Sequence, residues 1–452
     1  MTKLVLNRYI VRGNSKFKPH TLRIYFYIVA LILLLTAFSD CSQPADKIPK
    51  FSSNQDTLLI ATKLHKGAGK FERIFAPLRF NEFSDLAYPI KLPDHLTNIK
   101  HAFKIIDYDA YWYLKHKDEE NLTLPPFILE AILNKELDTT LLPTVDENQI
   151  DIISGMCDSV QVFVLDENNN QDLTDDSIRI IQPINWNSNE NLIKISIDIY
   201  NGKKIVKDST WVKVGSSLSK TFLLLGVAEY VTADFYLDDR FYQLGTADFQ
   251  SSFSYLEPRF ILLQEDSLVI DSIYLKDNLY PDEFVRLNNN YYRIHQVSKY
   301  GEYITLIKEQ DFSAQTGTQI GIKAPEFTAI STAGDTIISS NMHDKPMLIA
   351  NSCECGGDKK SLTAYYEIEK HYGSLAHIIH IDSGMPELNH DNGIHIEMED
   401  APNKNLYNQF RKAYCSRICY VIDKNNTVID KFYIADWKDV LPKIFSSERK
   451  TI

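Results

Sequence analysis

The chain has 452 residues, which corresponds to two or three domains at roughly 150 residues each. Hydrophobic residues make up 44% and charged residues 24%, a composition that excludes a disordered or fibrous chain. The formal net charge of -12 argues against nucleic acid or an anionic membrane surface as a partner, because both require clustered basic charge. Six cysteines are too few for a scaffold built on disulfides.

The amino terminus is predicted to be a secretion signal covering residues 1–41. Basic residues without any acid occupy positions 1–23, an apolar run follows at 24–38, and Cys41 stands just beyond it. As a helix this run is about 22 Å long, short of the ~30 Å hydrocarbon core of a bilayer. Cys41 resembles the acylated cysteine of bacterial lipoproteins, although Asp40 departs from that pattern.

We therefore expect an exported protein of the bacterial cell envelope, anchored to the membrane by a lipid on Cys41 and facing the periplasm or the cell surface. Signal cleavage without lipidation, and an apolar run that is retained as an anchor, are the alternatives. In each case the residues after 41 lie outside the cytoplasm, where free thiols become oxidised unless something keeps them reduced.

The middle of the chain is predicted to be mostly strand. Residues 42–150 are expected to be a mostly β region and residues 151–315 a β-rich domain, with a boundary near residue 150. Apolar and polar residues alternate in several short segments bounded by turn residues, which is typical of half-buried strands. These segments are 160–166, 193–200, 259–264 and 303–308. The segment 127–137 is expected to be a short helix.

One loop in this region invites a calcium interpretation, because oxygen ligands at every second position can wrap a hard cation. The candidate ligands are Asp166, Asn168, Asn170, Asp172 and Asp176. Gln171 stands where a loop of the EF-hand type requires glycine, and the final glutamate is absent. A hairpin turn rich in Asn and Asp is the competing interpretation. Cys157 is expected to be a buried apolar filler.

Residues 321–448 alternate between strand and helix patterns, which predicts an α/β sheet. Strands are expected at 327–330, 336–338, 346–350 and 376–381, a hairpin at 419–433, and helices at 359–372 and 406–414. The segments GIKAPEF (321–327), PMLIANSCECGGDKKSL (346–362) and CYVIDKNNTVI (419–429) carry a resemblance. They resemble the thioredoxin-like redoxins of the AhpC/TSA and TlpA type, and residues 230–325 are similar to the β-rich region that precedes the redoxin domain in many exported TlpA-like proteins. The fold class predicted from this resemblance is an α+β multidomain protein with a β-rich amino-terminal region followed by an α/β thioredoxin-like domain.

The resemblance implies thiol–disulfide exchange with protein partners in the envelope and no cofactor besides the cysteines. Cys355 matches the nucleophilic cysteine of the family, at the start of a helix whose N–H groups and dipole stabilise a thiolate. Asp358 replaces the family's second cysteine, so resolution is expected from Cys353, Cys415 or Cys419. Four cysteines allow three full pairings, and the sequence does not choose among them.

Three other interpretations of the cysteines stay open. The resemblance also allows a thiol peroxidase, because the Ser-x-x-Cys spacing ends at Cys355 and Arg417 has the spacing of the arginine that polarises the peroxide in peroxiredoxins, although Leu348 stands where that motif has proline. Arg417 also stands where the redoxin fold has its cis-proline. A tetrahedral zinc site fits four thiolates. A catalytically inert binding or structural lipoprotein fits one or two permanent disulfides.

The histidines of this domain are not expected to form a site. His377 and His380 fall on opposite faces of one strand, and His390 and His395 are expected in a solvated polar loop.

Overall fold

The computed structural model describes residues 48–448 apart from several short segments. The segments outside the described residues are 68, 72, 74, 76, 83–88, 121, 134–136, 143, 145–146, 187, 202–203, 218–221, 264–276, 353–358, 383–392, 398–400 and 412–415. The predicted signal and Cys41 therefore lie outside the described residues. Lys50–Ile452 forms one compact unit. Among the described residues, no helix is both long enough and apolar enough to cross a membrane.

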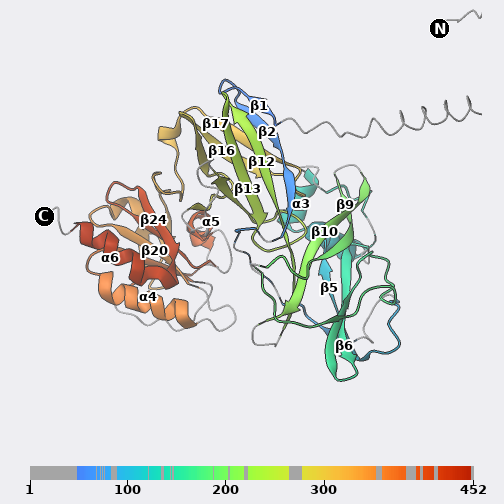
Figure 1. Cartoon of the computed structure of the whole chain (residues 1–452). Coiled ribbons are helices and arrows are strands. Elements are labelled where there is room, and N and C mark those ends of the chain that lie inside the picture. Colours follow the sequence, from blue (N-terminus) through green and yellow to red (C-terminus); the bar gives the residue numbers. More distant parts are fainter. Residues whose placement is uncertain are drawn as a thin grey trace, which may run out of the picture. The chain divides into compact units, whose positions relative to one another are not determined.

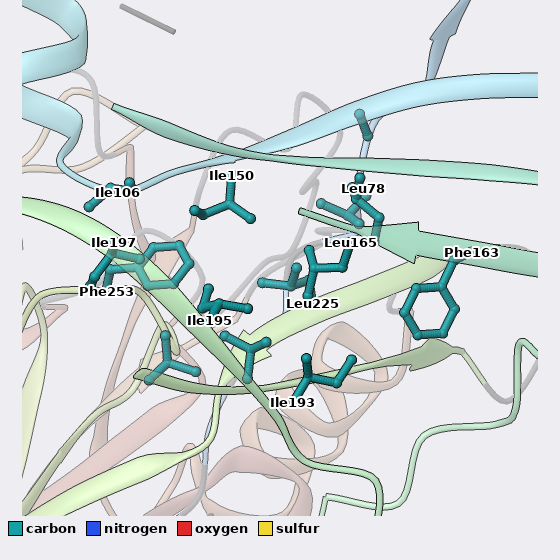
Figure 2. Packing of buried hydrophobic residues seen from close by; sticks show 14 of the residues in the cluster. Leu78, Ile106, Ile150, Phe163, Leu165, Ile193, Ile195, Ile197, Leu225 and Phe253 are labelled. Carbon is teal, nitrogen blue, oxygen red and sulfur yellow. The ribbon is translucent and has the colours of Figure 1, made fainter. Parts of the chain in front are cut away.

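Two sheets enclose the first core. The five-stranded sheet has the order β4-β5-β6-β7-β8, and the three-stranded sheet has the order β11-β10-β9. Their bounds are β4 Asn81–Glu82, β5 Thr97–Ile105, β6 Gln149–Cys157, β7 Val160–Leu165, β8 Arg179–Ile180, β9 Ile193–Tyr200, β10 Ile205–Ser216 and β11 Leu223–Val227. Figure 2 shows Ile150 and Leu165 of one sheet packed with Ile195 and Leu225 of the other. The expected boundary at residue 150 falls inside β6, which pairs with β5.

Two further sheets share a second core, drawn with β12, β13, β16 and β17 in Figure 1. One has the order β1-β12-β13-β14 with β3 also paired to β12, and the other the order β15-β16-β17-β2. Their bounds are β1 Lys50–Phe51, β2 Thr57–Ala61, β3 Lys63–Lys66, β12 Glu229–Leu237, β13 Arg240–Asp248, β14 Pro258–Leu263, β15 Phe284–Leu287, β16 Asn290–Val297 and β17 Tyr303–Glu309. Strand β2 alternates strictly between exposed and buried residues, so one face enters the core.

Two short helices lie between β5 and β6. Helix α2 (Tyr108–His116) begins where the Asp107 side chain accepts the Ala110 N–H, which satisfies one of the unpaired donors of the first turn. Helix α3 (Pro126–Leu133) lies in the segment predicted to be helical. Helix α2 was not predicted, although an aspartate at the N-cap position, here Asp107, is a usual start signal.

The carboxyl-terminal part is an α/β domain. Its sheet has the order β22-β21-β20-β23-β24, in which β20, β21 and β22 are parallel and β23 and β24 antiparallel. The bounds are β18 Thr328–Ile330, β19 Thr336–Ile338, β20 Met347–Asn351, α4 Lys359–Tyr372, β21 His377–Asp382, β22 Ile394–Glu397, α5 Lys404–Phe410, β23 Ile418–Ile422, β24 Val428–Tyr433 and α6 Trp437–Glu448. Short 3₁₀ turns occur at Phe312–Ala314, Ser339–Asn341, Ala401–Asn403 and Ile434–Asp436.

Helices cover both faces of this sheet. Helices α4 and α6 pack on one face through Ile368 and Leu441, which are fully buried. Helix α5 and the β18–β19 hairpin pack on the other face through Phe410 and Ala329. Every residue of β20 is buried, because a central strand covered on both faces has no solvent side. The segment 346–350 was predicted as such a strand for this reason.

The predicted elements of this domain are confirmed with small shifts of their ends. Helix α4 has the predicted bounds, and the two hairpins form as expected. Helix α5 begins two residues before the predicted start and ends earlier. The strand β22 was missed, and the prediction that His395 lies in a solvated loop is wrong, because His395 is 6% exposed within that strand.

Candidate functional site

Two cysteine-bearing segments of the α/β domain adjoin the same end of its sheet. The first follows β20, and the second leads into the antiparallel strand β23. Ser352 follows the last residue of β20 and directly precedes Cys353 in the chain, and α4 begins at Lys359. The segment with Cys415 connects α5 to β23. Cys353, Cys355 and Cys415 lie outside the described residues, and the described residues that flank them include Ser352 and Ser416.

Asn351 joins the two segments. Its side-chain amide Nδ2 donates to the backbone oxygen of Phe410 at 3.1 Å and to that of Ile418 at 2.7 Å. Asn351 is fully buried, so these bonds are shielded from water. Phe410 and Ile418 bracket the segment that contains Cys415 and Arg417. One side chain at the end of β20 therefore fixes both ends of that segment.

Arg411 makes a second connection. Its guanidinium Nη1 donates at 3.1 Å to the backbone oxygen of Ser352 and at 3.1 Å to that of Ile381. Arg411 is 1% exposed, and it is the largest fully buried side chain among the described residues. A guanidinium carries five donors, so it can bind several backbone carbonyls where strands end. The sequence analysis did not single out Asn351 or Arg411, because neither belongs to a motif.

Arg417 lies directly before β23, where the resemblance places it. Its backbone oxygen accepts the N–H of Ile434, which ties this turn to the end of β24. Arg417 and Ser416 line a cavity of about 1170 Å³ together with Arg411 and Gln409. The rest of the lining includes residues 249–250, 256–259, 280–283 and 316–318. A cavity of this size accommodates a ligand or a polypeptide segment.

Cys419 is the described member of the candidate cysteines. It lies in β23, is fully buried, and carries a free thiol. Burial raises the pKa of this thiol to about 12, because a thiolate is poorly stabilised in apolar surroundings. In the described state Cys419 is therefore a protonated packing residue. Cys157, expected to be buried, is half-buried at the end of β6.

Ser352, His380 and His395 form a row of buried polar side chains at the same end of the sheet. We call these three residues the buried histidine row. The Ser352 Oγ and His380 Nε2 atoms are 2.7 Å apart, and the Nδ1 atoms of His380 and His395 are 3.1 Å apart. The three residues are 1%, 0% and 6% exposed. His377, on the same strand, faces the opposite side and pairs with Asp344 at 2.6 Å, as its spacing from His380 predicted. His390 lies outside the described residues.

The predicted calcium loop is a tightly hydrogen-bonded turn. The carboxylate of Asp166 accepts the N–H groups of Asn170 and Gln171, and Asp176 accepts that of Glu167. Gln171 has a φ of +63°, the left-handed backbone that a glycine usually supplies at this position. The other candidate ligands bind protein groups: Asn168 and Asn170 donate to Asp175 of the same loop, and Asp172 forms an ion pair with Lys91.

Two acids of this loop, Asp166 and Asp176, have raised pKa values. Burial, with smaller contributions from Asp166 and Asp175, raises the pKa of Asp176 to about 7. Burial likewise raises the pKa of Asp166. In the part of the chain that the structure describes, no group of three or more His, Cys, Asp or Glu side chains is arranged to hold a metal ion. The hydrogen bonds described above hold the loop together, and calcium binding stays a prediction.

Comparison with known proteins finds similarity to solved structures and no match in sequence to a family model or a curated protein. The thioredoxin domain of a thiol-disulfide oxidoreductase from Bacteroides vulgatus is 14% identical, with 28% of this chain and 96% of that chain covered and a TM-score of 0.24. The exposed lipoprotein thioredoxin of Streptococcus pneumoniae is 17% identical, with 24% and 89% covered and a TM-score of 0.20. A thioredoxin-like protein from Bacteroides caccae is 17% identical, with 25% and 46% covered and a TM-score of 0.22.

The chain is a multi-sheet β-rich protein, about a quarter of which is structurally similar to thioredoxin-like thiol–disulfide oxidoreductase domains. The element order from β18 to α6 agrees with the order expected from the sequence, with β22 as an added edge strand.

Proposed function

We propose that this protein is a thiol–disulfide oxidoreductase of the cell envelope, with Cys355 as the nucleophile and Cys353, Cys415 or Cys419 as the resolving cysteine. The observation that carries the proposal is the joint anchoring of the two cysteine-bearing segments by Asn351 and Arg411. Cys355 stands three residues after Ser352, so the length of the chain alone keeps its Cα atom within about 11 Å of that of Ser352.

The position of Cys355 before α4 suits a nucleophile. Helix α4 begins at Lys359, and its first turn contains no acidic residue. The unpaired N–H groups and the dipole of a helix start stabilise a thiolate, which is the reactive form of cysteine. Asp358 immediately precedes the helix and opposes this effect with its negative charge.

Among the resolving candidates, the geometry favours Cys353 or Cys415 over Cys419. Cys419 is fully buried, and its thiol stays protonated near neutral pH because its pKa is raised to about 12. A resolving cysteine must reach the mixed disulfide, which a side chain inside β23 does only if the strand moves. Cys353 and Cys415 both adjoin residues of the anchored end, Ser352 and Ser416.

The partners we propose are proteins with accessible thiols or disulfides. Arg417 and Ser416 line the large cavity, which supports access of a partner segment to this end of the sheet. The signal predicted at residues 1–41 and the lipid anchor predicted on Cys41 support a location in the envelope. Arg417, which the resemblance places at the position of the fold's cis-proline, does not by itself distinguish a disulfide substrate from a peroxide substrate.

The test is dithiol-linked turnover of the full-length protein purified in detergent. Cys355→Ser is expected to abolish reduction of a protein disulfide, while Cys157→Ser, a control in β6, is expected to retain the wild-type rate. Wild-type turnover in Cys355→Ser would refute the assignment. Single serine variants of Cys353 and Cys415 then identify the resolving residue, as the one whose loss traps the mixed disulfide.

A further inference from the structure

A small polar cavity adjoins both β cores of the chain. Its lining includes Val227 and Phe253, which belong to the first core, and Tyr255, which packs against the second. The cavity has a volume of about 80 Å³. At roughly 10–15 Å³ for each water-sized unit, it accommodates about five to eight non-hydrogen atoms. Leu64 and Asp208 are exposed members of the lining, so the lining extends to the protein surface at β3 and β10.

Arg73 contributes a guanidinium to this lining. The guanidinium donates at 2.5 Å to the backbone oxygen of Val227 and also donates to that of Glu229, the first residue of β12. These bonds fix the cation beside the start of that strand. A guanidinium carries five donors in a planar fork, so it can hold these carbonyls and a ligand carboxylate at the same time.

Two carboxylates with partners on the protein belong to the same lining. Glu229 is half-buried, and its carboxylate accepts the Thr210 hydroxyl and the Trp211 N–H, each at 2.8 Å. Asp248 is 5% exposed, and its carboxylate accepts two N–H groups of the turn that follows β13. An ionised carboxylate offers about four acceptor positions, so each of these groups can also bind an ammonium ion.

The ionisable groups of the lining act on one another. Burial raises the pKa of Tyr255, Arg73 opposes this shift, and Glu229 and Asp248 add to it. Burial likewise raises the pKa of Glu229, and a cation bound beside it would favour its ionised form. Carboxylates outnumber the guanidinium in the described lining, although Lys104 interacts with Asp248 from outside it. The cavity therefore combines a site for a carboxylate with a site for an ammonium group.

Ser251 points to a ligand independently of these charges. It lines the cavity and is 1% exposed, and its Oγ makes no hydrogen bond to any residue that the structure describes. Buried hydroxyl groups are normally hydrogen-bonded. Ser251 also has a φ of +51°, in the left-handed region that residues other than glycine rarely adopt. A polar group bound in the cavity would give this hydroxyl its partner.

We propose that this cavity binds a small α-amino acid in its zwitterionic form. Arg73 binds the carboxylate, Glu229 and Asp248 bind the ammonium group, and Ser251 supplies a further hydrogen bond. A singly charged ligand would match only one of the two charge types in the lining, and the volume limits the ligand to the smallest amino acids. The inference is independent of the proposed redox function, because it uses neither cysteine segment.

The test is isothermal titration calorimetry of the full-length protein in detergent, with glycine as the probe. Glycine is expected to bind saturably with a Kd of about 1 mM or lower. Methylamine and acetate each carry only one of the two charges, so they are expected to bind at least about tenfold more weakly. Phenylalanine is expected not to bind, because its side chain exceeds the space in the cavity.

Three variants locate the binding. Glu229→Gln is expected to weaken glycine binding by at least about tenfold, because it removes a charge that faces the ammonium group. Asp234→Asn is the matched control, since Asp234 lies on the same strand β12 but outside the lining, and it is expected to stay within about twofold. Ser251→Ala removes only the hydroxyl, so it is expected to weaken binding by about threefold to tenfold and decides the matter if Glu229→Gln fails to fold.

The outcomes that overturn the proposal are distinct. No saturable binding of glycine to the wild type would show that the cavity holds water only. Equal glycine affinity in the wild type, Glu229→Gln and Ser251→Ala would place the binding elsewhere on the protein. Methylamine or acetate binding as tightly as glycine would refute the zwitterion assignment. Disulfide turnover is measured separately, so the proposed function stands or fails on its own assay.

Discussion

The connection made by Asn351 predicts a defined loss of stability at the end of β20. Asn351→Leu keeps the branched shape of the side chain and removes the two hydrogen bonds to the backbone oxygens of Phe410 and Ile418. At about 0.5–1.5 kcal/mol for each hydrogen bond, we expect a loss of roughly 1–3 kcal/mol, with more if the two carbonyls stay unsatisfied. Hydrogen exchange of peptides from β20 and β23 measures this loss locally.

Asn403→Leu is the matched control for this substitution. Asn403 is also buried, donates to the backbone oxygens of Ile330 and Glu397 at 3.0 Å, and accepts the N–H of Ile330 at 2.7 Å. With three hydrogen bonds, its loss is expected to reach roughly 1.5–4.5 kcal/mol. It binds the β18–β19 hairpin and β22, neither of which carries a cysteine.

The two variants separate stability from function. Asn351→Leu is expected to reduce disulfide turnover by about tenfold or more, because misplacement of a reacting group is costly. Asn403→Leu is expected to retain turnover within about twofold despite its larger loss of stability. Equal turnover in both variants would show that the anchored end of β20 does not organise the reaction, and the reasoning from Asn351 would be refuted.

Three further predictions concern single groups. Cys419, with its pKa raised to about 12 by burial, is expected to resist alkylation in the native protein at about pH 8.5 and to react only in denaturant; native labelling at the rate of Cys157 would contradict its burial. Burial raises the pKa of Asp176 from 3.8 to about 7, so the folded protein holds a proton that the unfolded chain releases, and stability falls as the pH rises from about 4 to 7. Asp176→Asn is expected to remove this decline in urea unfolding, and a decline of equal size in the variant would contradict the assignment. Arg417→Ala is expected to lower disulfide and peroxide reduction to the same small extent, within about threefold, whereas selective loss of peroxide reduction would favour the peroxidase interpretation.

Among the strands that the sequence predicted correctly are several in which only one face is buried. In β9, Ile193, Ile195 and Ile197 point into the core, while Lys194 is exposed and Ser196 half-buried. This alternation is a direct consequence of a sheet with one covered face, so it is visible in the sequence. The pairing of β2 with β17 is not visible, since Leu58 and Leu306 are far apart in the chain and register depends on the whole fold.

From the sequence, the resemblance proposed Cys355 and Arg417 as site residues, and these assignments stay predictions. The burial of His395 was not predicted, because it depends on the short strand β22, whose four residues carry little pattern. Its neighbour Tyr365 comes from a helix and contacts it edge-on, and a side chain at Gly393 would collide with the Tyr365 hydroxyl. Such contacts arise from packing between elements, which single-sequence patterns do not encode.

The central claim is that Cys355 cycles between a thiol and a disulfide. The most direct measurement is differential alkylation with peptide mapping of the full-length protein, before and after mild reduction. The account predicts that Cys355 alternates between a free thiol and a bond to one defined partner, with Cys419 unlabelled in both states. If all four cysteines of the α/β domain instead remain paired until the protein is denatured, the domain is a scaffold stapled by disulfides and the account is contradicted.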